Sequence, residues 1–514
     1  MTQGPLFLGT DIGTFGTKSC IVDTQGNIVS EAFEESDIII PNPGWAEQWP
    51  DVWWKVYCNN VNSVIKVAKI DPKDIASVSV SGLYSGSGIL VDRKFKPLRP
   101  CIIWMDRRAT EETGWVTKTV GEDEIFRITG NIIDPFYGFT KMLWIKKNEA
   151  GIWEKAHKSI TANGWCIYKL TGEHCLDHSS SGVFGGVYDI HKHDWSEKLM
   201  DELGIPRRLF PESLSLSKDI IGEITDAGAK ATGLRKGTPV CAGGIDAPVS
   251  SLSVTAFEDG DLASMIGTSM CNGFIQDKYR LSRRFINMPN VVDDLNKLYS
   301  FSGIASAGGA IRWFRDQLGT CEKLIGETSG INTYRILDMM AEKTPPGANG
   351  LVFMPHMVIG ERAPYWDRYV RSCLFGLTLY HTKAHIFRAF LEGVAYAMRY
   401  SIQSAEDAGI PLKRALLVDG GAKSPLWRQI ITDVTNIPFT YIEKAPGAPL
   451  GDALLAGVGV GLLKYENIYE WVNTTQVMKP DPKRVEIYER YFDMYKNVYK
   501  SLEECYESLS MITQ

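Results

Sequence analysis

Three glycine-containing turns carry residue types that can surround phosphate groups. The first, residues 11–18 (Asp-Ile-Gly-Thr-Phe-Gly-Thr-Lys), combines glycines, which let the backbone approach an anion closely, with hydroxyl and amide donors. The second is Gly267-Thr268-Ser269, and the third, residues 419–427, contains the pair Gly420-Gly421. One such turn is more often purely structural, but the first two together match the two-sided clamp that a nucleotide's phosphates require.

The first turn is not a P-loop of the G-x-x-x-x-G-K-[ST] kind. Thr17 rather than glycine precedes Lys18, and no glycine has the required spacing. If the protein uses ATP, this turn does not bind it as the P-loop of a P-loop ATPase does. The paired glycines of the third turn leave room for a flat ligand, because they follow a predicted strand and precede a helix start.

The elements that must position these turns are those of an α/β fold. The first turn lies between predicted strands at residues 6–9 and 19–23, and a helix capped by Asp51 and ended by Asp71 and Pro72 follows. Further strands are predicted at residues 76–80, 88–92, 101–104, 238–244, 263–266 and 416–418. Polar residues after these strands stand where open α/β sheets bind ligands.

The second half of the chain repeats the opening pattern. A strand at residues 263–266, a Gly-Thr turn and a second apolar run predict a similar half, with a boundary near residue 255. Apolar residues at helical spacing predict a helix over residues 383–408, stopped by Gly409 and Pro411, and Pro425 suits the first turn of another helix. Two related domains are therefore expected.

Length and composition limit the class of protein. A chain of 514 residues is too long for one core. The net charge of −6, without an arm of clustered Lys and Arg, argues against nucleic acid and anionic membranes as partners and favours small molecules. The ten cysteines include no C-x-x-C pair, and the longest apolar stretch, residues 453–463, is too short to span a bilayer, so we expect a cytoplasmic protein.

The order of motifs along the chain resembles the FGGY family of carbohydrate kinases, in the actin-like and hexokinase-like ATPase superfamily. Each motif is modest alone, but the ordered set runs over nearly the whole length. It consists of residues 11–18, Trp104-Met-Asp106-Arg107-Arg108, Lys141-Met-Leu-Trp144, Gly243-Gly244-Ile-Asp246, Gly267-Thr268-Ser269 and Asp419-Gly420-Gly421-Ala422-Lys423-Ser424-Pro425-Leu426-Trp427.

The resemblance implies an α/β fold with two ribonuclease-H-like (actin-like ATPase) domains around a central cleft. It predicts an N-terminal domain over residues 1–255 with the sugar site and first phosphate turn, a C-terminal nucleotide domain over 256–480, and a helical tail over 481–514. The implied activity is transfer of the γ-phosphoryl group of ATP, with Mg²⁺, to a hydroxyl of a ketose or polyol. Family members are often homodimers.

The resemblance also assigns roles by position. The family's catalytic aspartate falls on Asp246, which would accept the proton of the attacking hydroxyl, although an aspartate at a strand-to-helix turn is by default an N-cap. Asp11 falls on the position that reaches Mg²⁺, together with Asp246. The residues expected to face the phosphates and the adenosine are Thr14, Gly16, Thr17, Lys18, Gly267, Thr268, Ser269, Gly420, Gly421, Ala422 and Ser424.

The acceptor side departs from the family pattern. Trp104 and Asp106 match the segment that lines the acceptor pocket, and Phe136 extends it, although Asp106 could equally form an ion pair with a neighbouring arginine. Tyr84 and Ser85 stand where xylulose kinases carry polar side chains, and an alanine follows Asp246 in place of an amide. Glu361-Arg362-Ala-Pro364 nevertheless resembles a segment common in the xylulose-kinase branch. A xylulose-like pentulose is the first expectation, with erythritol, glycerol or gluconate as alternatives.

Two other functions stay open at this point. One is an ATPase of the same superfamily that hydrolyses ATP to change conformation, and the retained acceptor segment argues against it. The other is a non-catalytic sugar-binding regulator that closes on its ligand, and the intact Asp11 and Asp246 argue against it.

Overall fold

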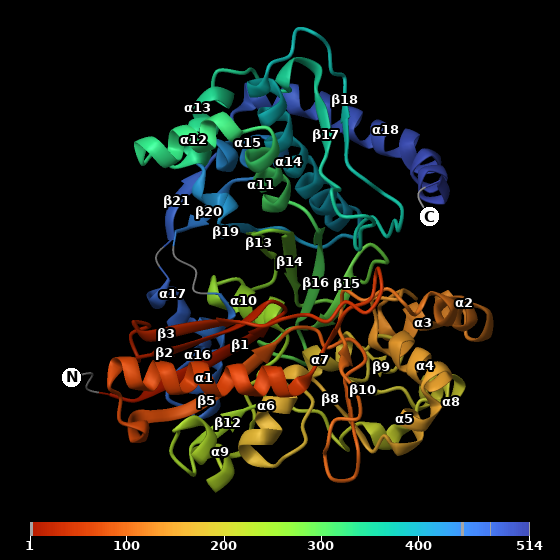
Figure 1. Cartoon of the computed structure of the whole chain (residues 1–514), viewed down its shortest axis with the longest axis vertical. Helices are drawn as coiled ribbons and strands as arrows, with labels where there is room; N and C mark the ends of the chain where they lie inside the picture. Colours follow the sequence, from red (N-terminus) through yellow and green to blue (C-terminus); the bar gives the residue numbers. More distant parts are fainter. Residues whose placement is uncertain (1–3, 444–446, 473, 513–514) are drawn as a thin grey trace. The chain divides into compact units, whose positions relative to one another are not determined.

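The computed structural model describes residues 4–443, 447–472 and 474–512, and the chain divides into two compact units (Figure 1). Both units are assembled from segments that are far apart in the sequence. The limits predicted at residues 255 and 480 belong to a linear division of the chain and stay predictions. The first unit consists of Met1–Phe257, Asp277–Tyr299 and Pro446–Val472, and the second of Glu258–Gln276, Ser300–Ala445 and Asn473–Gln514.

A six-stranded mixed sheet forms the centre of the first unit. Its strand order is β11-β12-β5-β1-β2-β3. Strand β1 pairs with β2 as an antiparallel hairpin and with β5 in parallel, so the first glycine turn begins beside the carboxyl end of β5. The strands span Leu6–Gly13 (β1), Gly16–Val22 (β2), Ile28–Glu35 (β3), Ile75–Gly82 (β5), Ile220–Glu223 (β11) and Pro239–Cys241 (β12).

The alternation of side chains along β1 assigns them to two faces. Leu6, Leu8 and Ile12 are buried in an apolar core with residues of α1 (Pro50–Ala68) and α6 (Ala162–Thr171). The other face meets α16 (Ala448–Gly459): a Cβ at Gly9 would lie 1.9 Å from the Pro449 carbonyl oxygen, so only glycine permits this approach. Asp11 shares the face of Gly9 and therefore points toward α16.

Helix α1 begins and ends differently from the prediction. Trp49 is the N-cap residue and Pro50 occupies the first turn, whereas Asp51 is exposed and is not the cap. Proline suits this place because its missing N–H would have no partner in the first turn. The helix ends at Ala68, before the predicted stop, because Lys69 adopts the left-handed conformation (φ 53°) that closes a helix.

The second unit repeats the strand pairing of the first. Strand β13 pairs with β14 as an antiparallel hairpin and with β19 in parallel, as β1 pairs with β2 and β5. The second glycine turn connects β13 to β14, and the third follows β19. The predicted repeat of the opening pattern is thus confirmed. These strands and their neighbour span Asp261–Ile266 (β13), Met270–Gln276 (β14), Arg414–Val418 (β19) and Phe439–Ile442 (β20).

Helices of the second unit position the rest of its site. The helix predicted over residues 383–408 is confirmed as α14, and Pro425 occupies the first turn of α15 as expected. No helix in the described ranges is long and apolar enough to cross a bilayer. The helices that the site uses span Gly308–Gln317 (α11), Thr333–Ala341 (α13), Lys383–Asp407 (α14) and Pro425–Thr435 (α15), and α18 (Pro482–Ile512) packs in the same unit.

Candidate active site

Three aspartates of the first unit interact electrostatically where β1 and β5 end. Asp11 stands near the end of β1, Asp246 begins α10 (Asp246–Ser253), and Asp452 belongs to α16. Gly82, the last residue of β5, forms a parallel bridge with Ile245, which brings Asp246 to the strand ends. The charges of Asp246 and Asp452 both act on Asp11. The carboxyl groups therefore form one cluster, which we call the carboxylate cluster.

Asp452 is held by two serines of β5. The hydroxyl of Ser79 donates to Oδ1 at 3.0 Å and the hydroxyl of Ser81 donates to Oδ2 at 2.6 Å. The two serines are alternate residues of the strand, so they share the face that meets α16. The sequence prediction missed Asp452, because it lies inside an apolar helix without a motif. The alternation Ser-Val-Ser-Val-Ser over residues 77–81 was the available signal of a polar row on a buried strand.

The carboxylate cluster collects negative charge. Burial raises the pKa of Asp11 well above its ordinary value, and the charges of Asp246 and Asp452 raise it further. Burial also raises the pKa of Asp452 to about 8, although its serine partners oppose the shift. Oδ1 of Asp11 is buried and accepts no hydrogen bond from the described residues. Like charges with an unpartnered oxygen are typical of functional sites.

Asp246 does not cap its helix. Ile245 is the N-cap residue of α10, and Asp246 is its first helical residue, so the N-cap interpretation is wrong. Oδ1 of Asp246 accepts a hydrogen bond from the backbone N–H of Ala247 at 2.7 Å, which orients the carboxyl group. The side chain is thus placed by the start of a helix without being needed to terminate it.

The first glycine turn is supported from both sides of the hairpin. Gln48 Nε2 donates to the carbonyl oxygen of Thr14 at 3.0 Å, and Trp104 Nε1 donates to its hydroxyl at 3.0 Å. A Cβ at Gly16 would lie 2.7 Å from the backbone carbonyl oxygen of Glu34, so this glycine is required by packing. The turn is therefore tied directly to the predicted acceptor segment.

Lys18 and Thr17 lie on opposite faces of the hairpin. Lys18 is the register partner of Asp11, lies on its face and forms an ion pair with Glu31 at 2.9 Å. Thr17 is the register partner of Ile12, and its side chain is fully buried on the core face. The Thr17 hydroxyl therefore does not share the face of Asp11, and its predicted phosphate contact stays a prediction.

Aromatic side chains form the predicted acceptor side. The rings of Tyr84 and Phe136 are 5.1 Å apart, and Trp104 is fixed by its hydrogen bond to Thr14. Lys141 Nζ donates to the carbonyl oxygens of Pro135 and Phe136, at 2.6 Å for Phe136, and so fixes the backbone that carries this ring. Burial lowers the pKa of Lys141 to about 7. The assignment of these aromatics to an acceptor stays a prediction.

Asp106 and Ser85 use their polar atoms inside the protein. The guanidinium of Arg108 donates to both carboxylate oxygens of Asp106, at 3.0 and 2.7 Å, and the Asp106 carboxylate also accepts the N–H of Ala46. The hydroxyl of Ser85 accepts the N–H of Ala162 at 2.7 Å. The ion pair considered for Asp106 is therefore present, and the geometry gives both residues a supporting position.

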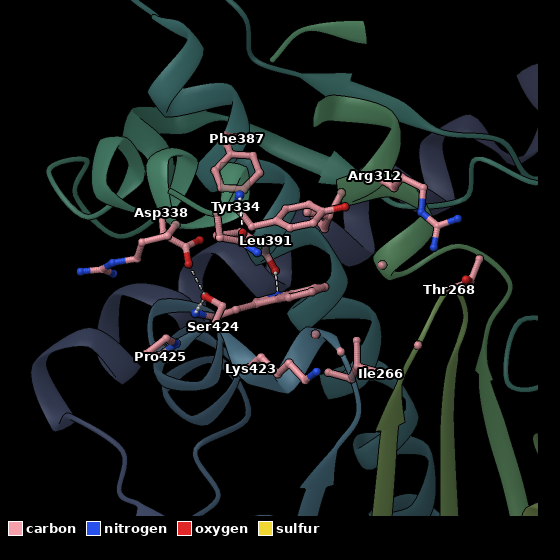
Figure 2. Close-up of a pocket in the computed structure, with 18 residues that line it drawn as sticks. Ile266, Thr268, Arg312, Tyr334, Asp338, Phe387, Leu391, Lys423, Ser424 and Pro425 are labelled. Atoms are coloured by element: carbon pink, nitrogen blue, oxygen red, sulfur yellow. Dashed lines mark hydrogen bonds between the residues drawn. The ribbon is translucent and has the colours of Figure 1, made fainter. Parts of the chain in front are cut away.

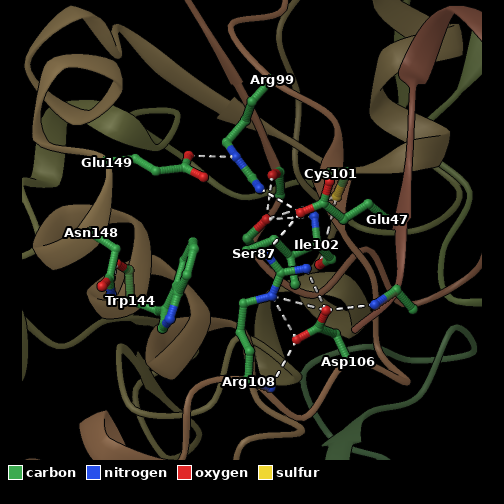
Figure 3. A network of polar contacts seen from close by, with 12 residues as sticks. Glu47, Ser87, Arg99, Cys101, Ile102, Asp106, Arg108, Trp144, Asn148 and Glu149 are labelled. Atoms are coloured by element: carbon green, nitrogen blue, oxygen red, sulfur yellow. Dashed lines mark hydrogen bonds and ion pairs between the residues drawn. The ribbon is translucent and has the colours of Figure 1, made fainter. Parts of the chain in front are cut away.

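Arg108 is the centre of a larger buried network (Figure 3). Its guanidinium also contacts Glu47 at 2.7 Å and lies 3.7 Å from the ring centroid of Trp45. Glu47 is shared with Arg99, whose second partner is Glu149 at 2.7 Å. Each charge in this arginine network has an opposite charge beside it. The network anchors the segment that carries Trp104.

The second unit contains a cavity of about 570 Å³, which has the size of a nucleotide pocket (Figure 2). Of the predicted residues, Gly267, Thr268, Gly420, Gly421 and Ser424 line it. Ser269 and Ala422 do not line it, and Ala422 is fully buried. The second and third glycine turns are therefore brought to one cavity.

Helices that carry no recognisable motif complete this cavity. The prediction missed Arg312 of α11, Tyr334 and Asp338 of α13, and the pocket contribution of Phe387 and Leu391 of α14. The last two lie on the apolar stripe of α14, which sequence periodicity could only assign to a core. These helices meet the glycine turns only in the folded protein, so no local spacing in the sequence identifies their residues as part of the cavity.

Close packing beneath the cavity, by Ile266 and Trp427, explains why one of the paired glycines, Gly421, is a glycine. A Cβ at Gly421 would lie 2.5 Å from Cγ2 of Ile266 and 2.8 Å from the ring of Trp427. Trp427 is buried and donates from Nε1 to the Leu391 carbonyl oxygen at 3.0 Å, the packing role expected for it. Gly420 has no atom within 4 Å of the corresponding position. Only Gly421 is required by close packing.

Comparison with known proteins assigns the chain to a family. Residues 6–253 match the N-terminal domain and residues 262–460 the C-terminal domain of the FGGY family of carbohydrate kinases. The chain is 27% identical to the xylulose kinase of Bacillus subtilis over 96% of both chains, and 29% identical to the gluconokinase of that species over 98% of this chain and 97% of the relative. The crystal structure of xylulose kinase from Rhodospirillum rubrum superposes with a TM-score of 0.88 at 26% identity, covering 98% of this chain and 100% of that one.

The chain therefore belongs to the FGGY family of carbohydrate kinases and has the two-domain, actin-like fold of that family. It is a phosphotransferase that acts on a sugar, and kinases of this family use ATP as the phosphate donor. The predicted family, fold class and enzyme class are confirmed. Xylulose kinases and gluconokinases are similarly related to it, so sequence identity does not select the acceptor.

Proposed function

We propose that this chain transfers the γ-phosphoryl group of ATP to a hydroxyl of a neutral ketose or polyol, most simply a xylulose-like pentulose, with Asp246 as the general base. The observation that carries the proposal is the carboxylate cluster. It stands at the carboxyl ends of two adjacent parallel strands, beside a glycine turn, where open α/β sheets bind their ligands.

Asp246 is the member of the carboxylate cluster suited to proton transfer. Its carboxyl group is oriented by the Ala247 N–H and is not consumed by helix capping. In the proposed reaction the oxygen of the acceptor hydroxyl attacks the γ-phosphorus atom of ATP, and ADP leaves. Asp246 accepts the proton that this hydroxyl loses. Positioned bases of this kind contribute about 10²- to 10⁴-fold to a rate.

Asp11 fits a magnesium ion. Its Oδ1 is buried and has no hydrogen-bond partner among the residues that the structure describes, and carboxylate oxygens are the ligands that Mg²⁺ prefers. Asp11 and Asp246 would hold the ion, which supplies positive charge to the phosphate groups. Asp452 is bound through both oxygens to Ser79 and Ser81, so it holds its place behind Asp11.

The nucleotide is assigned to the cavity of the second unit. The turn Gly267-Thr268 and the start of α11 offer backbone to the phosphates, and Gly420, Gly421 and Ser424 line the wall for the adenosine. Thr14 and Lys18, on the hairpin of the first unit, stay the predicted phosphate contacts of that unit. The proposed reaction uses both units.

A neutral acceptor is favoured over a sugar acid. The guanidinium of Arg107 donates to both carboxylate oxygens of Asp134, at 2.6 and 3.1 Å, so its charge is already matched. Lys141 is buried against two carbonyl groups. Neither cation is offered to a carboxylate, and the aromatic rings of Tyr84, Phe136 and Trp104 suit the apolar faces of a sugar.

The test is the initial rate of ADP release from Mg-ATP with D-xylulose, L-xylulose, L-ribulose, erythritol, glycerol and gluconate, each compared with a reaction without acceptor. We expect ADP release that depends on one neutral acceptor. ADP release at one rate with and without every acceptor would indicate an ATPase. Binding of a sugar without ADP release from any acceptor would indicate a sugar-binding regulator, and dependence on gluconate alone would reject the neutral acceptor.

A further inference from the structure

The nucleotide cavity has two chemically different ends. At one end lie the exposed Gly267-Thr268 turn and the guanidinium of Arg312, which offer hydrogen-bond donors. At the other end lie Asp338, Ser424 and Pro425, and Figure 2 shows them on the opposite side from Thr268 and Arg312. Arg335, which also lines the cavity and whose charge acts on Asp338, forms an ion pair with Glu342 at 2.9 Å. Donors suit the phosphates, so the base of a nucleotide would reach the end with Asp338.

Asp338 is a buried carboxylate on the wall of this cavity. It is 4% exposed, and its Oδ2 accepts a hydrogen bond from the hydroxyl of Ser424 at 2.8 Å. The hydroxyl oxygen of Ser424 itself accepts the N–H of Trp427 at 3.0 Å, as the N-cap of α15. The single hydroxyl proton of Ser424 therefore goes to Asp338, which must be the acceptor.

The second oxygen of Asp338 is left for a ligand. No other hydrogen bond from the described part of the chain reaches this carboxylate. Burial raises its pKa to about 6, with the Ser424 hydrogen bond and the charge of Arg335 opposing the shift, so the carboxylate is ionised at neutral pH. An ionised carboxylate only accepts hydrogen bonds, so the second oxygen of Asp338, a residue that lines the cavity, can accept one from a ligand.

We propose that Asp338 is the residue that selects the base of the nucleotide, by accepting a hydrogen bond from the 6-amino group of adenine. The inference rests on the proposed function, because it requires a nucleotide in this cavity. A 6-oxo purine would place a carbonyl oxygen against the carboxylate, and the repulsion weakens its binding. A bidentate pair with the N1–H and 2-amino group of guanine would require Oδ2 to accept a second hydrogen bond beside that of Ser424, so it is disfavoured relative to a single bond from adenine.

The variant Asp338→Asn tests whether Asp338 selects the base. In Asp338→Asn, the Ser424 hydroxyl still needs an acceptor, so the amide oxygen takes the place of Oδ2 and the NH₂ group faces the cavity. The wall of the cavity then presents a donor in place of an acceptor. This donor repels the 6-amino group and attracts a 6-oxo group, so the preference for the base should invert without loss of volume.

The experiment measures binding of ATP and of inosine triphosphate, which differs from ATP only in carrying a 6-oxo in place of a 6-amino group and a hydrogen on N1, by isothermal titration of the full chain. The native protein should bind ATP roughly 10- to 100-fold more tightly, the worth of one hydrogen bond to a charged group. Asp338→Asn should bring the two affinities to parity or reverse them. Glu327→Gln, the same change at an exposed position of α12 (Thr320–Ser329), is the matched control and should keep the native ratio.

The other outcomes overturn the inference. An unchanged ratio of ATP to inosine triphosphate affinity in Asp338→Asn would show that Asp338 does not contact the base. A loss of affinity for 2′-deoxy-ATP in the native protein that disappears in Asp338→Asn would assign the carboxylate to the ribose. Either result would reject the inference about Asp338 without contradicting the proposed kinase function. Failure of the native protein to bind any nucleoside triphosphate would reject both the inference and the proposed function.

Discussion

The first unit contains two buried groups of charged side chains that are built in opposite ways. In the arginine network, the carboxylates of Asp106 and Glu47 lie against the guanidinium of Arg108. In the carboxylate cluster, the acidic groups of Asp11, Asp246 and Asp452 lie together, and burial followed by repulsion from the other two raises the pKa of Asp11. Opposite charges with good geometry can hold a segment in place, whereas buried like charges cost stability. The difference supports a structural role for the network and is consistent with the proposed catalytic role of the cluster.

The largest expected effect is on catalysis by the carboxylate cluster. Asp246→Asn keeps the shape of the side chain but cannot accept a proton, so kcat should fall about 10³-fold. The thermal midpoint should not fall, because a negative charge is removed from a group of like charges. Steady-state rates with the preferred acceptor and a thermal scan measure both.

A matched variant is available for this comparison. Asp226 is the first residue of α9 (Asp226–Thr232), as Asp246 is of α10, and its side chain is exposed. Asp226→Asn should leave kcat unchanged. A similar kcat in Asp246→Asn and Asp226→Asn would remove the functional role of the carboxylate cluster.

The next effect concerns the arginine network. Arg108→Met leaves the buried Asp106 without its arginine partner and Glu47 with Arg99 alone, so unfolding by urea should show a loss of about 3–5 kcal/mol. Arg127→Met breaks an exposed pair with Glu124, which solvent screens, so the urea midpoint should stay close to that of the native protein. Equal losses in the two variants would contradict a structural role for the buried network.

A smaller effect of opposite sign is expected for Asp452. The unfolded chain ionises Asp452 near its ordinary pKa of 3.8, whereas the folded chain retains the proton up to about pH 8. The folded state binds more protons between these limits, so the native protein loses stability as pH rises through them. Asp452→Asn has no such proton, and it should be more stable at pH 8 by about 1–3 kcal/mol.

The pH dependence provides the control for Asp452. The gain in thermal midpoint of Asp452→Asn over the native protein should grow from pH 4 to pH 8 in buffers without divalent cations. Below pH 4 the thermal midpoints of the two proteins should converge, because Asp452 of the native protein is then protonated in both the folded and the unfolded state. A gain that is absent, or that shrinks as pH rises, would show that Asp452 is not held in the protonated form.

The smallest effect is one of packing without charge. Gly421→Ala places a methyl group 2.5 Å from Ile266 and should cost about 1–3 kcal/mol of stability in the second unit. Gly420→Ala meets no atom within 4 Å and has a helical backbone conformation, so its stability should not fall. Equal losses of the thermal midpoint would contradict the close packing beneath the cavity.

Local patterns predicted those parts of the fold that local patterns determine. The hairpins at the first two glycine turns and the long helix α14 were predicted because their apolar periodicity is strong and continuous. The sequence predicts Asp51 as the N-cap of α1, whereas the helix begins at Pro50. Pro50 and Asp51 both suit the first turn of a helix, and only the folded structure shows which of them follows the cap.

The candidate site was predicted where motifs mark it and missed where tertiary packing makes it. Asp11 stands near the end of β1 and Asp246 at the start of α10, positions that the sequence motifs mark. Asp452 and Asp338 lie within helices, and they become part of a site only because Ser81 and Ser424 meet them after folding. Sequence order contains no signal for such meetings between distant segments.

The central claim is that the carboxylate cluster directs phosphoryl transfer to a sugar hydroxyl. Phosphorus NMR of a reaction containing Mg-ATP and the preferred acceptor tests it most directly. One phosphate monoester should appear for each ADP formed by the native protein, and neither should appear on the same time scale with Asp246→Asn. Inorganic phosphate in place of the monoester, or an unchanged yield of monoester from Asp246→Asn, would contradict the claim.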